Sequence, residues 1–349
     1  MEKIASLDGP QRCWSIGHST DVAAARRYGL QLSRSLGFDE GASGRVSLII
    51  TEAAGNVLKH AGEGKLFLTQ VSDGDINGIE ILALDRGPGI SDLAHSLNDG
   101  VTTTGTPGNG LGALLRLSDR FDAYTGAGKG SAFYMCVWSS PPVRRATALE
   151  AGAICVPVPP EEVCGDGWGM TSSQDSATFL LSDGLGHGIN AAHASRTARE
   201  LLIRHPALQP GAFMEAAHRA LHRTRGAAMA VAQLHYSSEQ LGFAGIGNIS
   251  ACVTDGLSRN HLVSHNGIVG HNMRKVQEFT VPFPRRSLYI MHSDGIKTHW
   301  DLAAYPGLYL RHPALIAAII YRDFARDRDD ASVFVIRRTY TSQNGFYDT

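Results

Sequence analysis

The chain has 349 residues, with 32 Lys and Arg against 33 Asp and Glu, which gives a formal net charge of -1. This balance argues against binding to nucleic acid or to a membrane surface through bulk charge. A hydrophobic content of 43% and a charged content of 19% exclude a disordered or fibrous chain. The length predicts two domains, each large enough to bury its own core.

Cysteines and terminal segments indicate the compartment. The five cysteines are scattered and form no CxxC pair, which predicts free thiols in a reducing environment. The N-terminus lacks the apolar core of a signal peptide, and no apolar run approaches membrane-spanning length. We therefore expect a cytoplasmic protein that binds neither a membrane nor nucleic acid.

Hydrophobic periodicity predicts an α+β first domain over residues 1–138. The expected elements are a strand at 12–16, helices at 19–36 and 46–60, strands at 65–71 and 78–84, a helix at 111–117, and strands at 121–125 and 132–137. Ser139-Ser-Pro-Pro142 then predicts a break, so we place a linker at residues 139–150.

Three polar patterns in this domain follow one another in order. Glu52 and Asn56 are four residues apart on a predicted helix and therefore share one face. Asp85 ends a predicted strand and begins a Gly-rich turn, and a second glycine run, 108–112, begins a helix whose backbone N–H groups suit phosphate. Each pattern alone has a plainer interpretation, as a solvated helix face, a hairpin turn or a simple loop. Their order favours a nucleotide site.

These residues resemble the GHKL (Bergerat) ATP-binding fold, an α/β sandwich. Within that fold, Thr51–Gly62 and Gly110–Asp119 look most like the RsbT/RsbW serine kinases that control bacterial sigma factors. The resemblance covers roughly residues 12–138. It implies that Asn56 holds Mg²⁺ between the phosphates of ATP and that Glu52 orients or deprotonates the attacking hydroxyl.

The same resemblance implies roles for the acid and the glycines that follow. By this resemblance, Asp85 would accept a hydrogen bond from the adenine amino group. The glycines would let the chain approach the base, at Gly87 and Gly89, and wrap the phosphates, at Gly108, Gly110 and Gly112. Gly55 departs from the pattern, since many relatives carry a second Asn there, and Ser131 stands where Thr is frequent.

The second domain is expected over residues 151–338, with a C-terminal tail at 339–349. Prolines in the strand 152–158 predict an edge position, because proline cannot donate to a ladder. The other expected elements are a strand at 177–181, helices at 189–203 and 210–224, strands at 227–235, 241–246, 249–254, 262–263 and 286–293, a helix at 313–325 and a strand at 328–336.

Acidic residues recur in this domain in turns at the ends of predicted strands. They are Asp166, Asp183, Asp294 and the pair Asp329-Asp330. Each aspartate alone could be an ordinary turn residue. Converging carboxylates without a Cys/His cage favour Mg²⁺ or Mn²⁺ over Zn²⁺, and two such ions can activate a water for attack on phosphorus.

This set of motifs resembles the SpoIIE/RsbX branch of metal-dependent (PPM) Ser/Thr protein phosphatases, over residues 152–336. The resemblance implies an α-β-β-α sandwich in which Asp183 is shared by two metals. The remaining ligands it implies are the Gly184 carbonyl, Asp166, Asp294 and Asp329. Asp329 is preferred to Asp330 because the first acid of this motif is the ligand in relatives. For His187, next to the metal turn, we favour a structural or supporting role over that of a proton donor.

Together the motifs predict a bacterial switch enzyme with opposed activities. The first domain would use Mg-ATP to phosphorylate Ser or Thr on a STAS-type antagonist or scaffold, and the second would remove such phosphates with two Mn²⁺ or Mg²⁺ ions. A sigma factor or an RsbR/RsbS-like scaffold is a further candidate partner, and a homodimer is left open.

Two alternatives remain. In one, the first domain is a non-catalytic ATP-binding module, with a lid near residues 90–110, that grips a partner and gates the phosphatase. In the other, the chain is a small-molecule phosphatase with a vestigial ATP fold.

Overall fold

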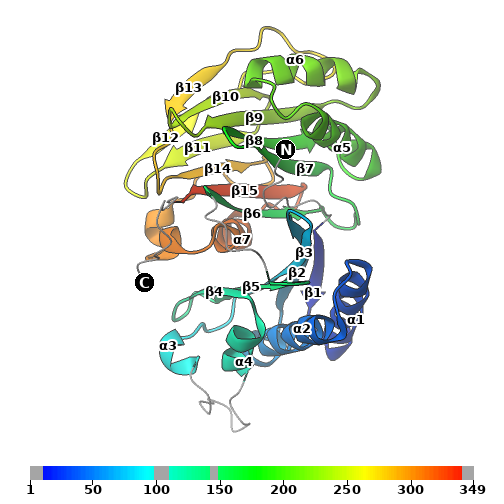
Figure 1. Cartoon of the computed structure of the whole chain (residues 1–349), viewed down its shortest axis with the longest axis vertical. Helices are drawn as coiled ribbons and strands as arrows, with labels where there is room; N and C mark the ends of the chain where they lie inside the picture. Colours follow the sequence, from blue (N-terminus) through cyan, green and yellow to red (C-terminus); the bar gives the residue numbers. More distant parts are fainter. Residues whose placement is uncertain (1–10, 98–109, 142–147, 340–349) are drawn as a thin grey trace. The chain divides into compact units, whose positions relative to one another are not determined.

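The computed structural model describes residues 11–97, 110–141 and 148–339 (Figure 1). Two compact units are present: Leu7–Val143 with Leu310–Ala318 form one, and Arg144–Tyr309 with the residues from Ile319 onward belong to the other. Gly108, half of the predicted linker (142–147) and the predicted tail beyond residue 339 lie outside the described residues. Each unit is described by itself below.

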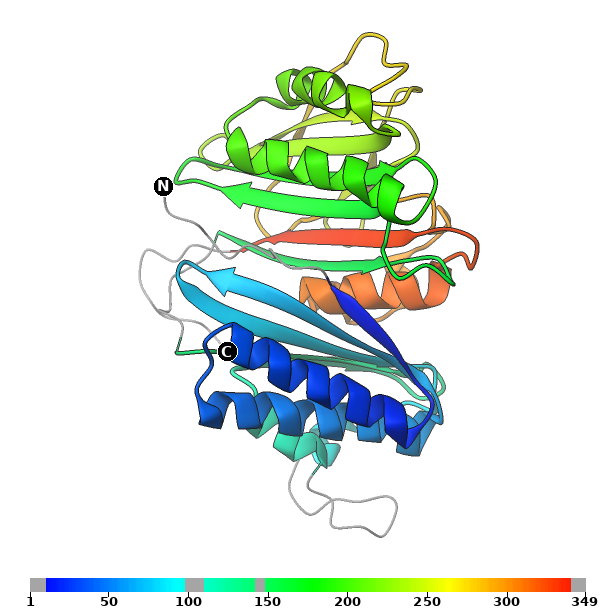
Figure 2. The same cartoon turned by 90° about the vertical axis from the view of Figure 1, so that its right-hand side faces the viewer.

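The first unit contains a five-stranded antiparallel sheet in the order β1-β2-β3-β5-β4. Helices α1 and α2 run side by side along one face of this sheet (Figure 2). The elements are β1 (Arg12–Ile16), α1 (Ser19–Ser35), α2 (Glu40–Ala61), β2 (Gly64–Asp73), β3 (Ile76–Asp85), α3 (Leu93–Ser96), α4 (Gly110–Leu117), β4 (Arg120–Thr125) and β5 (Ser131–Trp138).

Helix α2 supplies the core of this unit and carries two of the predicted site residues. It begins at Glu40, six residues before the expected start, because the Asp39 carboxylate accepts a hydrogen bond from the Ala42 N–H at 2.6 Å and caps the first turn. The apolar stripe predicted from Val46 to Val57 is buried in the core. The side of the helix that carries Glu52 and Asn56 is therefore outside this buried stripe.

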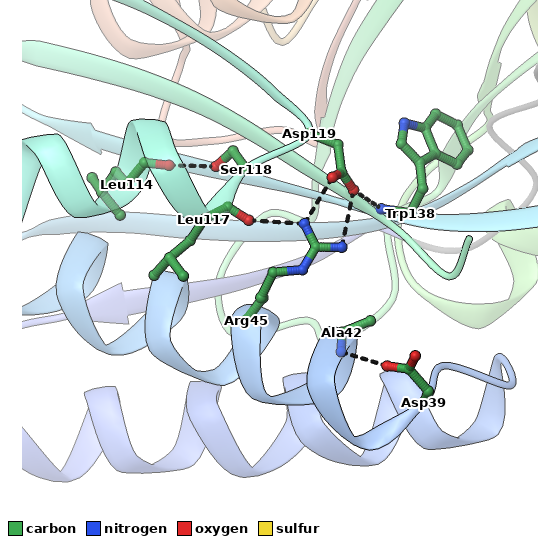
Figure 3. Close-up of polar contacts among 8 residues, drawn as sticks. All are labelled: Asp39, Ala42, Arg45, Leu114, Leu117, Ser118, Asp119 and Trp138. Carbon is green, nitrogen blue, oxygen red and sulfur yellow. Dashed lines mark hydrogen bonds and ion pairs between the residues drawn. The ribbon is translucent and has the colours of Figure 1, made fainter. Parts of the chain in front are cut away.

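An arginine on α2 fixes the position of α4 (Figure 3). Nη1 of Arg45 donates to the Leu117 carbonyl at 3.1 Å and to Oδ1 of Asp119 at 2.7 Å. Oδ2 of Asp119 accepts from the Trp138 N–H at 2.7 Å. The C-terminal end of α4 is therefore tied to both α2 and β5.

The second unit is built on two five-stranded antiparallel sheets, ordered β13-β10-β9-β8-β7 and β12-β11-β14-β15-β6. The sheets face each other, with ring centroids 5.1 Å apart for Trp168 and Phe334 and 6.0 Å apart for Phe179 and Tyr289. Helices α5 and α6 cover the outer face of the first sheet (Figure 1). At the far end of α7, Phe324 accepts through its carbonyl from the Lys297 N–H at 2.8 Å, beyond β14.

Most of the segments predicted from the sequence begin and end within a few residues of the observed elements. These elements are β6 (Leu149–Val156), β7 (Asp166–Ser172), β8 (Ser176–Gly184), α5 (Ile189–Arg204), α6 (Pro210–Ala220), β9 (Ala227–His235), β10 (Gln240–Ile246), β11 (Ser250–Thr254), β12 (Arg259–Leu262), β13 (Phe279–Pro282), β14 (Leu288–His292), α7 (Pro313–Phe324) and β15 (Ala331–Arg338). The predicted edge position of β6 is confirmed. The helix expected to reach residue 224 ends at Ala220 and continues as a 3-10 turn over Leu221–Arg223.

Strand β7 was not predicted, because its glycines look like a turn. A Cβ on Gly165 would lie 2.7 Å from the Cβ of Ala191, and one on Gly167 would lie 2.9 Å from the Cβ of Ser195. Both contacts are with α5, so the missing side chains let this helix lie directly on the strand. Strand β13 and the short helix α3 were also not predicted. No helix in the described ranges has both the length and the apolar character that crossing a membrane requires.

Candidate functional site

In the first unit, Glu52 and Asn56 meet the beginning of α4. A Cβ built on Gly110 would collide with Oε1 of Glu52 and lie 3.6 Å from Nδ2 of Asn56. The face of α2 that carries Glu52 and Asn56 therefore lies next to the first residue of α4. Gly112, two residues further into α4, is buried.

Asn56 carries a donor that has nothing to bind within the described residues. Its Nδ2 is buried and makes no hydrogen bond there. An unpartnered buried amide costs about 1–3 kcal/mol, so such groups normally mark a place for a ligand or a bound water. The atom lies beside the N-terminal turn of α4, where backbone N–H groups face outward. This pair of features fits a polyphosphate.

Asp85 is held by the backbone around it. Its Oδ1 accepts from the Gly87 N–H at 2.8 Å and from the Ser131 N–H at 3.1 Å. Gly89 has φ +71°, and a Cβ there would collide with the Gly126 carbonyl, so the turn after β3 packs directly on the loop between β4 and β5. Asp85, Gly87 and Gly89 therefore form one rigid corner of the site.

Sequence reasoning missed Thr125, which also supports this corner. Its Oγ1 accepts from the Ile90 N–H at 2.8 Å and lies 3.0 Å from the Ser131 hydroxyl. Ser131, which stands where Thr is frequent, thus still places a hydroxyl within hydrogen-bond distance of Thr125. The glycine-rich loop that follows Thr125 was the available sign of its position.

In the second unit, the strand pairing brings two of the predicted metal ligands together. Asp166 and Asp183 stand opposite each other on β7 and β8. Asp183 was expected on a turn after the strand, but β8 continues through Gly184 because Ala227 and Ala228 of β9 pair with its last two residues. Both carboxylates are consequently fixed by a ladder rather than by a loop.

The carboxylates of Asp166 and Asp294 are each half satisfied. Oδ2 of Asp166 accepts from the Ser332 hydroxyl at 2.6 Å, and Oδ2 of Asp294 accepts from Nδ2 of Asn248 at 2.5 Å. Oδ1 of each is buried and has no hydrogen-bond partner in the described part of the chain. Buried carboxylate oxygens without donors fit a hard divalent cation.

Burial, together with the mutual repulsion of these acids, raises their pKa values. Burial, followed by the negative charges of Asp166, Asp294 and Asp329, raises the pKa of Asp183 to about 9. Burial also raises the pKa of Asp166 to about 7, although hydrogen bonds from Ser332 and Ser293 oppose it. Burial and the charge of Asp329 raise the pKa of Asp294. The cluster needs positive charge to be fully ionised.

The neighbouring acids Asp329 and Asp330 have different surroundings. Asp330 accepts from the Val158 N–H at its Oδ1 and from the Gly165 N–H at its Oδ2, both at 2.7 Å, and so holds the loop between β6 and β7. Oδ1 of Asp329 accepts from the Asp330 N–H at 2.9 Å. The backbone contacts of Asp330 support Asp329 as the ligand of the pair.

Histidines near the site have packing partners. Nδ1 of His187 lies 2.7 Å from Oε1 of Glu161, on the exposed side of the turn after β8. Burial lowers the pKa of His292 to about 4, and its Nε2 accepts from the Trp300 indole N–H at 3.2 Å. These contacts are consistent with supporting roles.

Among the described residues, no group of three or more His, Cys, Asp or Glu side chains is arranged to hold a metal ion. The acids nevertheless affect one another's pKa, and two buried oxygens lack donors. The donor types present, carboxylate oxygens with unsatisfied lone pairs, thus fit divalent cations chemically.

Comparison with known families and proteins agrees with both halves. Residues 18–137 match the histidine kinase-like ATPase domain, and residues 173–339 match the family of stage II sporulation protein E (SpoIIE). The serine/threonine-protein kinase RsbT of Bacillus subtilis (strain 168) is 36% identical over 128 residues, which cover 37% of this chain and 96% of RsbT.

Solved structures also resemble this chain. A chain from a structure of the bacterial stressosome, described as a modular system adapted to control secondary messenger signaling, has a TM-score of 0.51 and 25% identity. The match covers 55% of the present chain and all of that one. RsbX in complex with magnesium matches with a TM-score of 0.47 and 16% identity, over 56% of this chain and 97% of RsbX. The chain belongs, through its N-terminal part, to the RsbT family of histidine kinase-like ATPases, and it joins this domain to a SpoIIE-type phosphatase domain.

Proposed function

We propose that this chain is a bifunctional regulator in sigma-factor or stress signalling. It would phosphorylate Ser or Thr of a STAS-type partner and also remove that phosphate. Residues 1–138 would act as the kinase and residues 151–338 as the phosphatase. The observation that carries the proposal is the presence of both sites in one chain: the orphaned amide beside α4 and the half-satisfied carboxylates between the sheets.

In the kinase site, Mg-ATP supplies the phosphoryl group. Asn56 would hold the magnesium between phosphates, and Glu52, one turn earlier on α2, would orient the attacking hydroxyl or take its proton. Asp85 would accept from the base, since two backbone N–H groups already fix its Oδ1. The N-terminal turn of α4, with Gly110 and Gly112, would receive the phosphates.

In the phosphatase site, two Mn²⁺ or Mg²⁺ ions supply charge neutralisation and an activated water when bound. Asp183 would be shared by both ions, with the Gly184 carbonyl beside it. Asp166, Asp294 and Asp329 would complete the set. Ser332 and Asn248 would hold two of these carboxylates in orientation through the hydrogen bonds described above.

One experiment tests both activities. Full-length protein is incubated with radiolabelled ATP and STAS-domain candidates, and phosphate on the partner is followed with and without Mn²⁺. Glu52→Ala should slow transfer by about 100-fold or more, because general-base help is removed. Asp183→Asn should slow release by about 1,000-fold, because the shared ligand is lost.

Matched controls are Glu63→Ala and Asp175→Asn, which change exposed acids outside both sites. Unchanged transfer by Glu52→Ala would refute its role. Nucleotide-dependent binding of the partner without any transfer by the wild type would favour the alternative, an ATP-binding module that gates the phosphatase.

A further inference from the structure

The chain between α6 and β9 ends beside the turn that follows Asp183. In the pairing of β8 with β9, Asp183 stands opposite Ala228 and Gly184 stands opposite Ala227. The pairing continues beyond both strands, because the Leu185 N–H donates to the Gly226 carbonyl at 3.0 Å. Arg225 is the next residue out, and it therefore lies over the turn itself.

The guanidinium of Arg225 rests directly on that turn. A Cβ built on Gly186 would lie 2.9 Å from Nη1 of Arg225. Gly186 has φ +84°, a left-handed conformation that side chains rarely adopt, and the absence of a side chain leaves room for the arginine. The positive charge is thus placed within a few residues of the carboxylate predicted to bridge two metals.

Arg225 is exposed and forms no hydrogen bond or ion pair with any described residue. This is unexpected beside so many acids. The nearby Glu161 is paired with His187 on the same turn. A fork of five donors without an acceptor, at the edge of a cluster that must take up cations, is suited to an oxyanion.

The backbone on either side of Arg225 is held firmly. The Thr224 hydroxyl donates to the Leu221 carbonyl at 2.8 Å and accepts from the Gly226 N–H at 3.0 Å. The Thr224 carbonyl accepts from Nε2 of His271 at 3.0 Å. The next residue, Ala227, exchanges two backbone hydrogen bonds with Val269. The backbone that carries Arg225 is consequently well ordered, which lowers the entropic cost of ordering the side chain around a ligand.

We propose that Arg225 binds the phosphoryl oxygens of the substrate at the Asp183 turn. The ligand class is a phosphomonoester dianion, and the inference deepens the phosphatase function on which it rests. A guanidinium can donate two parallel N–H···O bonds to phosphate, and this geometry would hold the phosphorus over the metal-binding carboxylates. Arg225 makes no bond to the leaving group and transfers no proton.

Binding of inorganic phosphate to the Mn²⁺-loaded full-length chain, measured by calorimetry, tests this assignment without relying on turnover. Arg225→Ala should weaken phosphate binding by about tenfold or more, the loss expected for a charged hydrogen bond. Arg225→Lys should recover part of it, because the charge remains but the fork is lost. Mn²⁺ affinity should be unchanged in both variants. Arg223→Ala, an exposed arginine two residues earlier, is the matched control and should bind phosphate like the wild type.

With a phosphoserine protein as substrate, Arg225→Ala should raise KM at least tenfold. Phosphate affinity equal to that of the wild type would overturn the assignment and leave the phosphatase function standing. Equal losses of Mn²⁺ and phosphate affinity would also overturn it, by showing a structural role. A wild-type protein that binds phosphate through Arg225 but releases none from phosphoserine would sink the proposed function and keep the arginine site.

Discussion

The two candidate sites of this chain, both proposed to bind phosphate groups, have opposite electrostatics. The first is lined by backbone N–H groups and by one amide, Asn56, that has no partner in the described residues. The second is lined by carboxylates that repel one another and bind protons more tightly than free aspartate does. The first site is therefore ready for an anion, whereas the second requires cations before an anion can approach.

Separating the adjacent acids Asp329 and Asp330 tests the cation side of this comparison most strongly. Asp329→Asn should reduce Mn²⁺-dependent phosphatase turnover by about 100-fold or more, through loss of a metal ligand, with the fold intact. Asp330→Asn should instead destabilise the fold by about 1–3 kcal/mol, because a carboxamide cannot accept both backbone N–H groups that Asp330 now receives.

Turnover and urea unfolding, measured on both variants, distinguish the two roles. A stable Asp330→Asn protein without metal affinity, next to a fully active Asp329→Asn protein, would reverse the assignment.

A glycine tests the anion side. Gly110→Ala places a methyl group where Oε1 of Glu52 now lies, so the carboxylate has to move. We expect phosphotransfer at saturating ATP to fall by about tenfold or more, since small displacements of positioned groups are costly. Phosphatase turnover should not change.

The control is Gly44→Ala on α2, the helix that carries Glu52, where a new Cβ meets nothing within 4 Å. It should leave transfer intact and stabilise the helix by up to about 1 kcal/mol. Equal transfer rates for the two variants would show that the close approach of Gly110 to Glu52 is not needed for transfer.

The smallest expected effect concerns Glu80, a partly buried acid on β3 in the sheet of the first unit. Burial raises its pKa to about 7 from a usual value of 4.5, although the Tyr134 hydroxyl donates to its Oε1 at 2.7 Å. The fold thus favours the protonated form. Its stabilising contribution is complete below about pH 4.5 and is lost as the pH rises through about 7.

Glu80→Gln keeps an acceptor for Tyr134 and removes the ionisation. Its advantage in stability over the wild type should grow by on the order of 1–2 kcal/mol between pH 5 and pH 8. Thermal unfolding at both pH values measures this difference. Glu63→Gln, at an exposed position, should show no such trend, and an equal advantage of Glu80→Gln at both pH values would contradict the assignment.

Sequence periodicity identified most elements because hydrophobic residues facing a core repeat with the period of the element. It failed at β7, where Gly165 and Gly167 satisfy the packing of α5 instead of a local turn. It also ended β8 too early, since the pairing of Asp183 with Ala228 depends on a strand more than forty residues away.

The residues of the second candidate site could be predicted only in part. Acids in glycine-rich segments indicated a metal site, and the aspartates prove to influence one another's pKa. No local sequence pattern indicated the proposed role of Arg225, because that role depends on its contact with Gly186, at the end of the neighbouring strand. The different roles of Asp329 and Asp330 likewise depend on backbone N–H groups more than 160 residues away.

The pairing of β6 with β15 has a consequence for synthesis on the ribosome. Val156 lies opposite Ala331, so the sheet that includes β6 cannot close until the last described strand has emerged. The sheet of the first unit uses only residues 12–138 and can form much earlier. Every nascent chain therefore passes through a stage in which the strands of the ATP-binding sheet are complete while Asp329 has not yet been made. The order of translation alone therefore delays completion of the sheet that contains β6 and β15 relative to the sheet of the first unit.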